Sequence, residues 1–113
     1  MESVWLVSEG RVLASALRAT THAERRHGLL GVHHVEQPLV LEPCAWVHSL
    51  GMRTNLDIAY VNKDDVVIRT ARLKRWRIPA PVRRSVRIVE AAPGSLERWN
   101  LRPGDILEVR QSS

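Results

Sequence analysis

A chain of 113 residues, 44% of them hydrophobic, can enclose one core, so we predict a single domain over residues 1–113. No apolar run approaches the roughly 20 residues needed to cross a bilayer, and no basic or long apolar leader opens the chain. These features predict a cytoplasmic protein without membrane contact. The formal charge of +5 is local, because residues 69–87 carry eight bases and no acid. The single cysteine, Cys44, excludes a scaffold held by internal disulfides.

The first third of the chain predicts a hairpin followed by a helix. Residues 4–7 and 12–17 are apolar enough for two strands, and Glu9-Gly10 between them predicts a turn. Thr21 and Glu24 have the spacing of a capping box, in which each side chain accepts a hydrogen bond from the other residue's backbone amide. A short helix is therefore expected over residues 22–30.

The middle of the chain predicts three strands before a polar turn. Pro38 and Pro43 flank residues 39–41, and because proline lacks an amide proton we expect an edge strand there. A loop through Gly51 is expected to join strands at 45–49 and 56–61.

The second of these strands alternates clearly. Leu56, Ile58 and Tyr60 share one face, so Asp57 must lie on the other. A polar turn at 62–65 and a return strand at 66–71 complete a hairpin.

The last third predicts a loop, two strands and a helical turn. Pro79 and Pro81 push the residues before them toward extended geometry, so the basic segment should be a loop. Strands are expected at 86–91 and 106–110, with a helical turn at 95–99. Seven to eight short strands, one short helix and a second helical turn predict a mainly β (α+β) fold, built as a compact barrel or sandwich.

Four short motifs lie along the chain. They are Arg25-x-x-Gly28-Leu29, His48-x-x-Gly51-Met52-Arg53-x-x-x-Asp57, Glu90-x-x-x-Gly94 and Gly104-Asp105. In these motifs the sequence resembles a bacterial and archaeal family, domain of unknown function 192, over residues 12–109. Leu30, Ser49 and Asn55 depart from the residues usual in that family, which are Met, Thr and Pro. The resemblance implies a compact β-rich fold and no particular activity.

His48, Arg53 and Asp57 form the strongest candidate site. The predicted loop would bring His48 near Asp57, and an aspartate beside an imidazole can orient it as a general base. Arg53 can bind a carboxylate or phosphate through two hydrogen bonds. Met52 and Arg25 come from the same family motifs and complete the predicted ligand-binding set. In the structural alternative, Asp57 pairs with Arg53 or Arg25 and only holds the loop in place.

The sequence gives less support for a cysteine nucleophile or a metal site. Cys44 lies four residues before His48, about 13 Å away along an extended strand, which is out of hydrogen-bond reach for a nucleophile and its base. The five histidines show no ligand spacing. We therefore predict no metal and no cofactor.

The basic segment suggests a different class of function. Arg72, Lys74, Arg75 and Arg77 surround Trp76, so phosphate-binding charge is combined with a ring on which a base can stack. The alternative is a solvated loop whose tryptophan packs back onto the domain.

Three functions can be ranked from these features. A binding module for a small polar or anionic ligand comes first, because it needs only a pocket and one charged anchor. A small enzyme with a His48/Asp57 acid-base centre comes second. Binding of nucleic acid or an acidic partner through residues 69–87 comes third.

Overall fold

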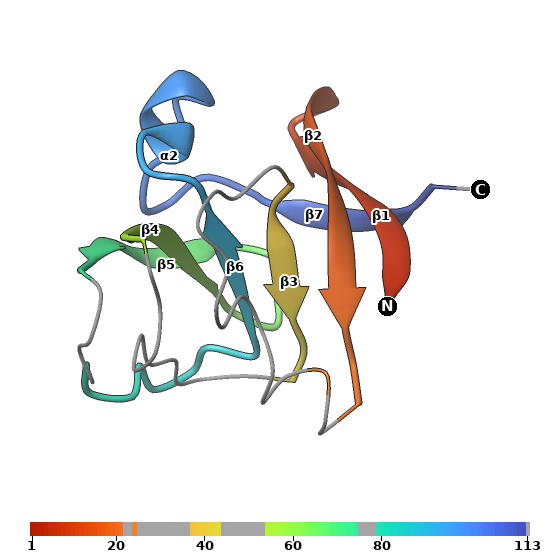
Figure 1. Cartoon of the computed structure of the whole chain (residues 1–113). Helices are drawn as coiled ribbons and strands as arrows, with labels where there is room; N and C mark the ends of the chain where they lie inside the picture. Colours follow the sequence, from red (N-terminus) through yellow and green to blue (C-terminus); the bar gives the residue numbers. More distant parts are fainter. Residues whose placement is uncertain (22–23, 25–36, 44–53, 75–78, 113) are drawn as a thin grey trace.

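A computed structural model describes residues 1–21, 24, 37–43, 54–74 and 79–112 of the chain (Figure 1). Within this part of the chain, no helix is long and apolar enough to cross a membrane. The described elements are β1 (Glu2–Ser8), β2 (Arg11–Ala19), β3 (Leu39–Leu41), β4 (Leu56–Val61), β5 (Val67–Leu73), β6 (Arg87–Ala91), α2 (Ser95–Arg98) and β7 (Glu108–Gln111).

The seven strands form one sheet in the order β5-β4-β6-β3-β2-β1-β7. All neighbours pair antiparallel except β2 and β3, which are parallel. An isolated bridge between Val66 and Ile106 connects the two ends of this order, but the sheet is not closed into a barrel. The predicted mainly β class is thus confirmed, in the form of a single seven-stranded sheet with a short helix.

The prediction that residues 39–41 form an edge strand is wrong. β3 lies inside the sheet, between β2 and β6 (Figure 1). Pro38 and Pro43 fall just outside the three paired residues, so no amide of the ladder is lost. The Pro38 carbonyl even accepts a hydrogen bond from the Leu17 amide, at 3.0 Å. Flanking prolines therefore set the length of this strand without placing it at an edge.

The hairpin of β4 and β5 forms as the sequence predicts. Asn62 shapes its turn, because the Asn62 side-chain oxygen accepts hydrogen bonds from the amides of Asp64 and Val66, both at 2.9 Å. All six residues of β4 are buried, so this strand carries core side chains on both faces. The face that holds Asp57 is therefore buried like the face of Leu56, Ile58 and Tyr60.

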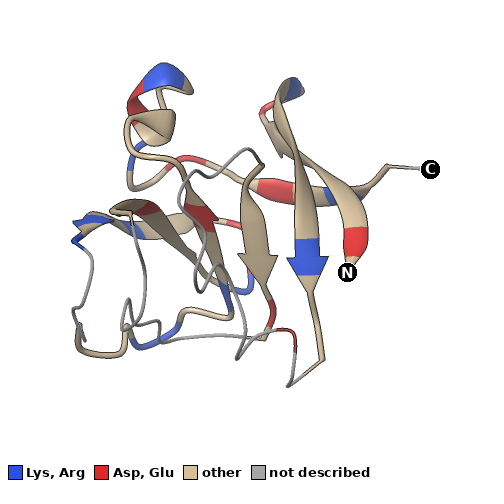
Figure 2. Cartoon of the chain, viewed as in Figure 1, with Lys and Arg blue, Asp and Glu red and all other residues tan. Residues whose placement is uncertain are grey.

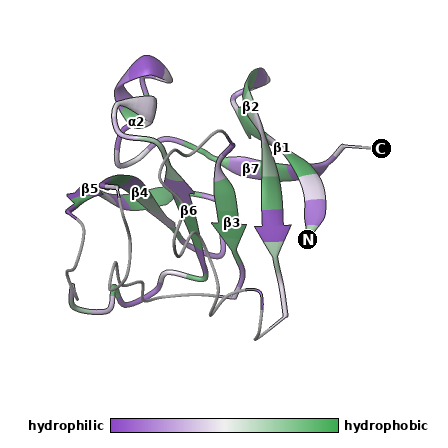
Figure 3. Ribbon diagram, in the orientation of Figure 1, coloured by the Kyte–Doolittle hydropathy of each residue, from purple (hydrophilic) through white to green (hydrophobic). Residues whose placement is uncertain are grey.

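Two core clusters lie on opposite faces of the central strands. One contains Val40, Ala59 and Val89 together with Leu96 of α2, and we call its side of the sheet the α2 face. The other contains Leu39, Ile58 and Ile88, and its side is called the opposite face. Members of each cluster alternate along β3, β4 and β6, as the period of a strand requires. Figure 3 shows these strands largely in the hydrophobic colour.

The capping box predicted at Thr21 is present. The Glu24 amide donates to Thr21 Oγ1 at 3.1 Å, and the Thr21 amide donates to Glu24 Oε1 at 3.3 Å. The predicted helical turn at 95–99 is also present, as α2. Both motifs form where the sequence predicts them, and the capping box depends on neighbouring residues alone.

Candidate functional site

Asp57 is held by three donors on the α2 face of the sheet. Its Oδ1 accepts a hydrogen bond from Arg72 Nε at 2.6 Å. Its Oδ2 accepts from the backbone amides of Gly94 at 2.9 Å and Leu96 at 3.3 Å. The side chain of Asp57 is 6% exposed, whereas that of Arg72 on the edge strand β5 is 53% exposed. Asp57 therefore satisfies amides at the start of α2, which otherwise have no partner within the helix.

This contact joins two of the motifs that lie far apart in the sequence. Asp57 ends the second motif, and Gly94 ends the third. Gly94 adopts a left-handed backbone with φ of 90°, a conformation that favours glycine. A Cβ atom at this position would lie 3.0 Å from Nη1 of Arg98, so the site is also crowded. The two motifs thus fix the attachment of α2 to β4.

Glu90 is a second buried carboxyl, and it lies in a different environment. It is 3% exposed, and its Oε1 has no hydrogen-bond partner among the described residues. Burial raises the pKa of Glu90 to about 7, since a charged carboxylate is poorly solvated there. Figure 2 shows the acidic band on β6 beside β3, a strand that carries no charge.

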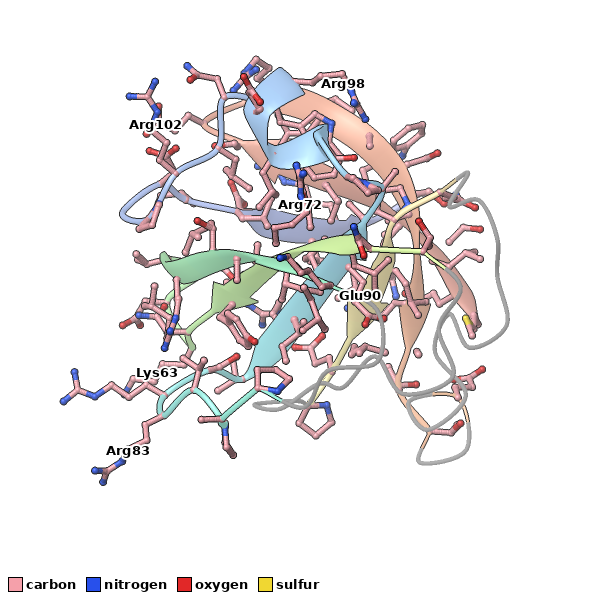
Figure 4. All side chains as sticks on the ribbon, turned by 60° about the vertical axis from the view of Figure 1, so that its left-hand side comes forward. Lys63, Arg72, Arg83, Glu90, Arg98 and Arg102 are labelled. Carbon is pink, nitrogen blue, oxygen red and sulfur yellow. The ribbon has the colours of Figure 1, made fainter. Side chains whose placement is uncertain are left out.

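The two carboxyls lie on neighbouring strands and point to opposite faces. Glu90 pairs with Ile58 of β4, and Asp57 pairs with Ala91 of β6, so they occupy adjacent levels of the same ladder. Val89 belongs to the α2 face, which places Glu90 with Ile88 on the opposite face. Figure 4 labels Glu90 and also Arg72, which lies below α2. The sheet therefore separates a carboxylate with partners from a carboxyl whose Oε1 has none among the described residues.

Other charges on these strands are paired. Arg87, at the start of β6, donates to Glu42 at 2.9 Å and to Asp65 at 2.6 Å. Glu42 also lies 3.5 Å from Arg18, which in turn binds Glu2 at 2.7 Å. This network crosses one end of the sheet from β1 to the hairpin of β4 and β5. Glu90 is on the same strand as Arg87 and stands outside the network.

Several predicted site residues lie outside the described residues. They are Arg25, Cys44, His48, Met52, Arg53, Arg75, Trp76 and Arg77. Of the predicted basic segment, Arg69 and Arg87 lie in β5 and β6, where strands were predicted at 66–71 and 86–91, and Arg72 lies in β5 beyond the predicted end of that strand. Lys74 is exposed just after β5. The strands extend into the basic segment because β4 offers paired positions as far as Leu73.

The sequence-based prediction of the site did not include Glu90, although it belongs to the third motif. The available signal was an acid between apolar residues in a predicted strand, Arg87-Ile-Val-Glu-Ala91. An acid in a strand buried on both faces must be desolvated, and such groups often mark functional sites. The expected partners of Asp57 were Arg53 or Arg25, and the partner seen among the described residues is Arg72.

The described ranges hold no group of three or more His, Cys, Asp or Glu residues that could bind a metal ion. A polar surface cavity of about 360 Å³ lies apart from both carboxyls. It is lined by Ser8, Glu9, Arg11, Asn100, Arg102 and Asp105.

Known proteins share this sequence pattern and this fold. A family model for DUF192, described as Uncharacterized ACR, matches residues 4–109. UPF0127 protein PF1050 of Pyrococcus furiosus is 37% identical over 71 residues, which are 63% of this chain and 61% of that protein. The chain therefore matches less than two thirds of the length of this relative.

Two crystal structures resemble the whole fold. A protein of unknown function from Novosphingobium aromaticivorans has a TM-score of 0.77 at 20% identity, over 94% of this chain and 83% of that one. A candidate transcription regulator from Sinorhizobium meliloti has a TM-score of 0.76 at 18% identity, over 96% of this chain and 92% of that one. At these identities the likeness shows the fold alone.

Proposed function

Because the chain belongs to the DUF192 family, whose motifs contain both His48 and Glu90, we propose that it is a binding module for a small polar ligand. The ligand contacts Glu90 on the opposite face of the sheet, together with His48 and Arg53. Met52 and Arg25 complete the site, and a cytoplasmic location is part of the same proposal.

The free oxygen of Glu90 carries this proposal. Buried polar groups nearly always have hydrogen-bond partners, and an exception calls for an explanation. Oε1 of Glu90 lacks such a partner within the described ranges, and the raised pKa of the group reflects the cost of burying its charge. A ligand that donates a hydrogen bond to Oε1 would remove this cost.

The connection between β3 and β4 supports a role for the central motif. Residues 42–55 join these two strands, and both strands pair with β6. Glu90 itself pairs with Leu39 of β3 and with Ile58 of β4. The segment with His48, Met52 and Arg53 therefore begins and ends at the strands that flank Glu90.

The contacts of Asp57 favour a binding module over an enzyme. Arg72 and two backbone amides occupy most of the acceptor positions of the Asp57 carboxylate. An aspartate used in this way is poorly placed to orient His48 as a base. The same contact weakens the proposal of polyanion binding, because Arg72 already has a carboxylate partner.

A thermal-shift screen tests the binding module directly. Small organic cations, anions and polyols would be added to the wild-type protein and to E90Q, H48A and R53A at pH 6 and pH 8. E97Q is the matched control, because Glu97 is an exposed glutamate of α2. We expect at least one compound to raise the Tm of wild type and E97Q and to lose this effect in E90Q and R53A. If no compound acts in this way, the proposal is wrong.

A further inference from the structure

We infer that the polar cavity of about 360 Å³ is a second binding site, and that its ligand is a free α-amino acid with a polar side chain. Glu90 does not line this cavity, so the inference goes beyond the binding function proposed for Glu90. It depends on how three turns of the chain hold charges of both signs around one space.

The cavity is formed by turns that lie far apart in the sequence. One turn joins β1 to β2, one follows α2, and one precedes β7. All the side chains that they contribute are polar: Ser8, Glu9, Arg11, Asn100, Arg102 and Asp105. Because none of these described lining residues is apolar, a ligand that fits the cavity must be polar itself.

Hydrogen bonds fix the turns relative to one another. Arg11 Nη2 donates to the Trp99 carbonyl at 2.7 Å, which connects the first turn to the end of α2. Asp105 Oδ2 accepts from the Arg102 amide at 2.8 Å, and the Asp105 carbonyl accepts from the Val67 amide at 2.8 Å. The walls are therefore in place before a ligand arrives, which lowers the entropy cost of binding.

Glu9 occupies an unusual position for a glutamate. Glu9 and Gly10 have φ of 49° and 79°, as the two central residues of a type I′ hairpin turn require. Asn, Asp and Gly adopt this conformation readily, whereas a longer side chain costs conformational energy. Such costs occur often at functional sites. The turn thus gives up some stability and places a carboxylate at the cavity.

Charges of both signs line the cavity without neutralising one another. It has two acids, Glu9 and Asp105, and two bases, Arg11 and Arg102, yet no salt bridge joins any of these four described residues. The carboxylate of Glu9 and the guanidinium group of Arg102 have no partner in the described part of the chain. The network around Arg87 differs, because its opposite charges are paired. The turns thus hold opposite charges apart across one space.

This arrangement selects a ligand by its charges. A simple anion would bind the guanidinium groups but would also approach two carboxylates, and a simple cation would approach two guanidinium groups. An α-amino acid carries both charges on one carbon atom. Its carboxylate can bind an arginine through two hydrogen bonds while its ammonium group donates to Glu9 or Asp105. Asn100 and Ser8 can then bind a polar side chain, so such a ligand uses every group that lines the cavity.

The test uses L-asparagine and three analogues that lack one or both of its charges. Succinamate lacks the ammonium group, β-alaninamide lacks the carboxylate, and propionamide lacks both. Each compound is titrated into the wild-type protein at pH 7, with binding followed by the amide NMR shifts of Glu9, Asn100 and Asp105. We expect L-asparagine to bind with a Kd of about 1 mM. Each singly charged analogue should bind about fivefold more weakly, the upper range for a partly exposed ion pair.

Two variants separate the charges on the protein. R102Q should weaken L-asparagine and succinamate about fivefold without weakening β-alaninamide, and E9Q should weaken L-asparagine and β-alaninamide without weakening succinamate. R83Q and E97Q are the matched controls, because Arg83 and Glu97 are exposed and do not line the cavity. Figure 4 shows Arg83 well away from Arg102. Equal Tm values for the four variants and the wild type establish that the fold is intact.

Each other outcome overturns the inference. If succinamate binds as tightly as L-asparagine, the cavity is a site for anions, and if β-alaninamide does so, it is a site for cations. If propionamide binds as tightly, charge plays no part. If no compound shifts the resonances of the lining residues, or if R102Q behaves like R83Q, the cavity does not bind amino acids. E90Q should bind L-asparagine like the wild type, and a loss in E90Q would place the binding at Glu90 instead.

Discussion

Asp57 and Glu90 show two treatments of a buried carboxyl within one ladder of the sheet. On the α2 face, Asp57 accepts hydrogen bonds from Arg72, Gly94 and Leu96 and so connects an edge strand, a central strand and a helix. On the opposite face, Glu90 lies among aliphatic side chains, and its Oε1 has no partner among the described residues. The fold depends on the first carboxylate, whereas the second makes the fold less stable when it is charged.

This difference separates a structural role from a functional one. A group that satisfies buried amides contributes to stability, and its removal should cost free energy of unfolding. A buried group without partners lowers stability, and such costs collect at functional sites. Substitutions of the two carboxyls should therefore change stability in opposite directions.

The largest effect is expected for D57A. The variant leaves the amides of Gly94 and Leu96 without their acceptor, and each buried unsatisfied amide costs about 1–3 kcal/mol. We expect the free energy of unfolding to fall by about 3 kcal/mol in urea titrations, with a Tm lower by roughly 10–20 °C. D57N should lose less, because its amide oxygen can still accept from the helix.

The control for D57A is D64N, since Asp64 is an exposed aspartate in the turn of the same hairpin of β4 and β5. Surface substitutions of this kind usually change stability by less than about 0.5 kcal/mol. If D57A were as stable as D64N, Asp57 would not anchor α2. Asp57 would then have no structural role to set against the functional role proposed for Glu90.

An effect of similar size and opposite sign is expected for E90Q at pH 8. Because the folded-state pKa of Glu90 is raised from 4.5 to about 7, the folded protein binds this proton more tightly than the unfolded chain. The stability of the wild type should therefore fall as pH rises from 4.5 to 7, by about 3 kcal/mol in total. Gln cannot ionise, so E90Q should be more stable than wild type above pH 7 and similar to it near pH 4.5.

Urea titrations of wild type, E90Q and E97Q at several pH values measure this difference. E97Q should keep the pH dependence of the wild type, because Glu97 is exposed. Equal slopes for wild type and E90Q between pH 4.5 and 7 would show that Glu90 has a compensating partner. In that case the buried charge would no longer argue for a ligand.

The same contrast explains how much of the molecule the sequence could predict. The hairpin of β4 and β5 and the cap at Thr21 follow from alternation and from spacing, both of which act between residues close in the chain. The interior position of β3 could not be predicted in this way, because proline restricts only its own amide and says nothing of which strands pair. The family motifs contain both Asp57 and Glu90, but only Asp57 was among the predicted site residues, and the environments of both depend on the pairing of β4 with β6. The partner of Asp57 likewise comes from α2 and β5, which lie far from it in the sequence.

Glu24 provides the smallest predicted effect, because it is a partly exposed carboxyl that has partners. The N-terminal ammonium group of Met1, 3.0 Å away, and the amides of Thr21 and Thr20 lower the pKa of Glu24 from 4.5 to about 2. Its contribution to stability should therefore be present above pH 4.5 and should be lost as pH falls toward 2. Acetylation of the N-terminus removes the largest of these causes, so the NMR titration midpoint of the Glu24 carboxyl should rise toward 4.5. An unchanged midpoint would mean that the two amides alone hold the charge, and that the ammonium group adds nothing in water.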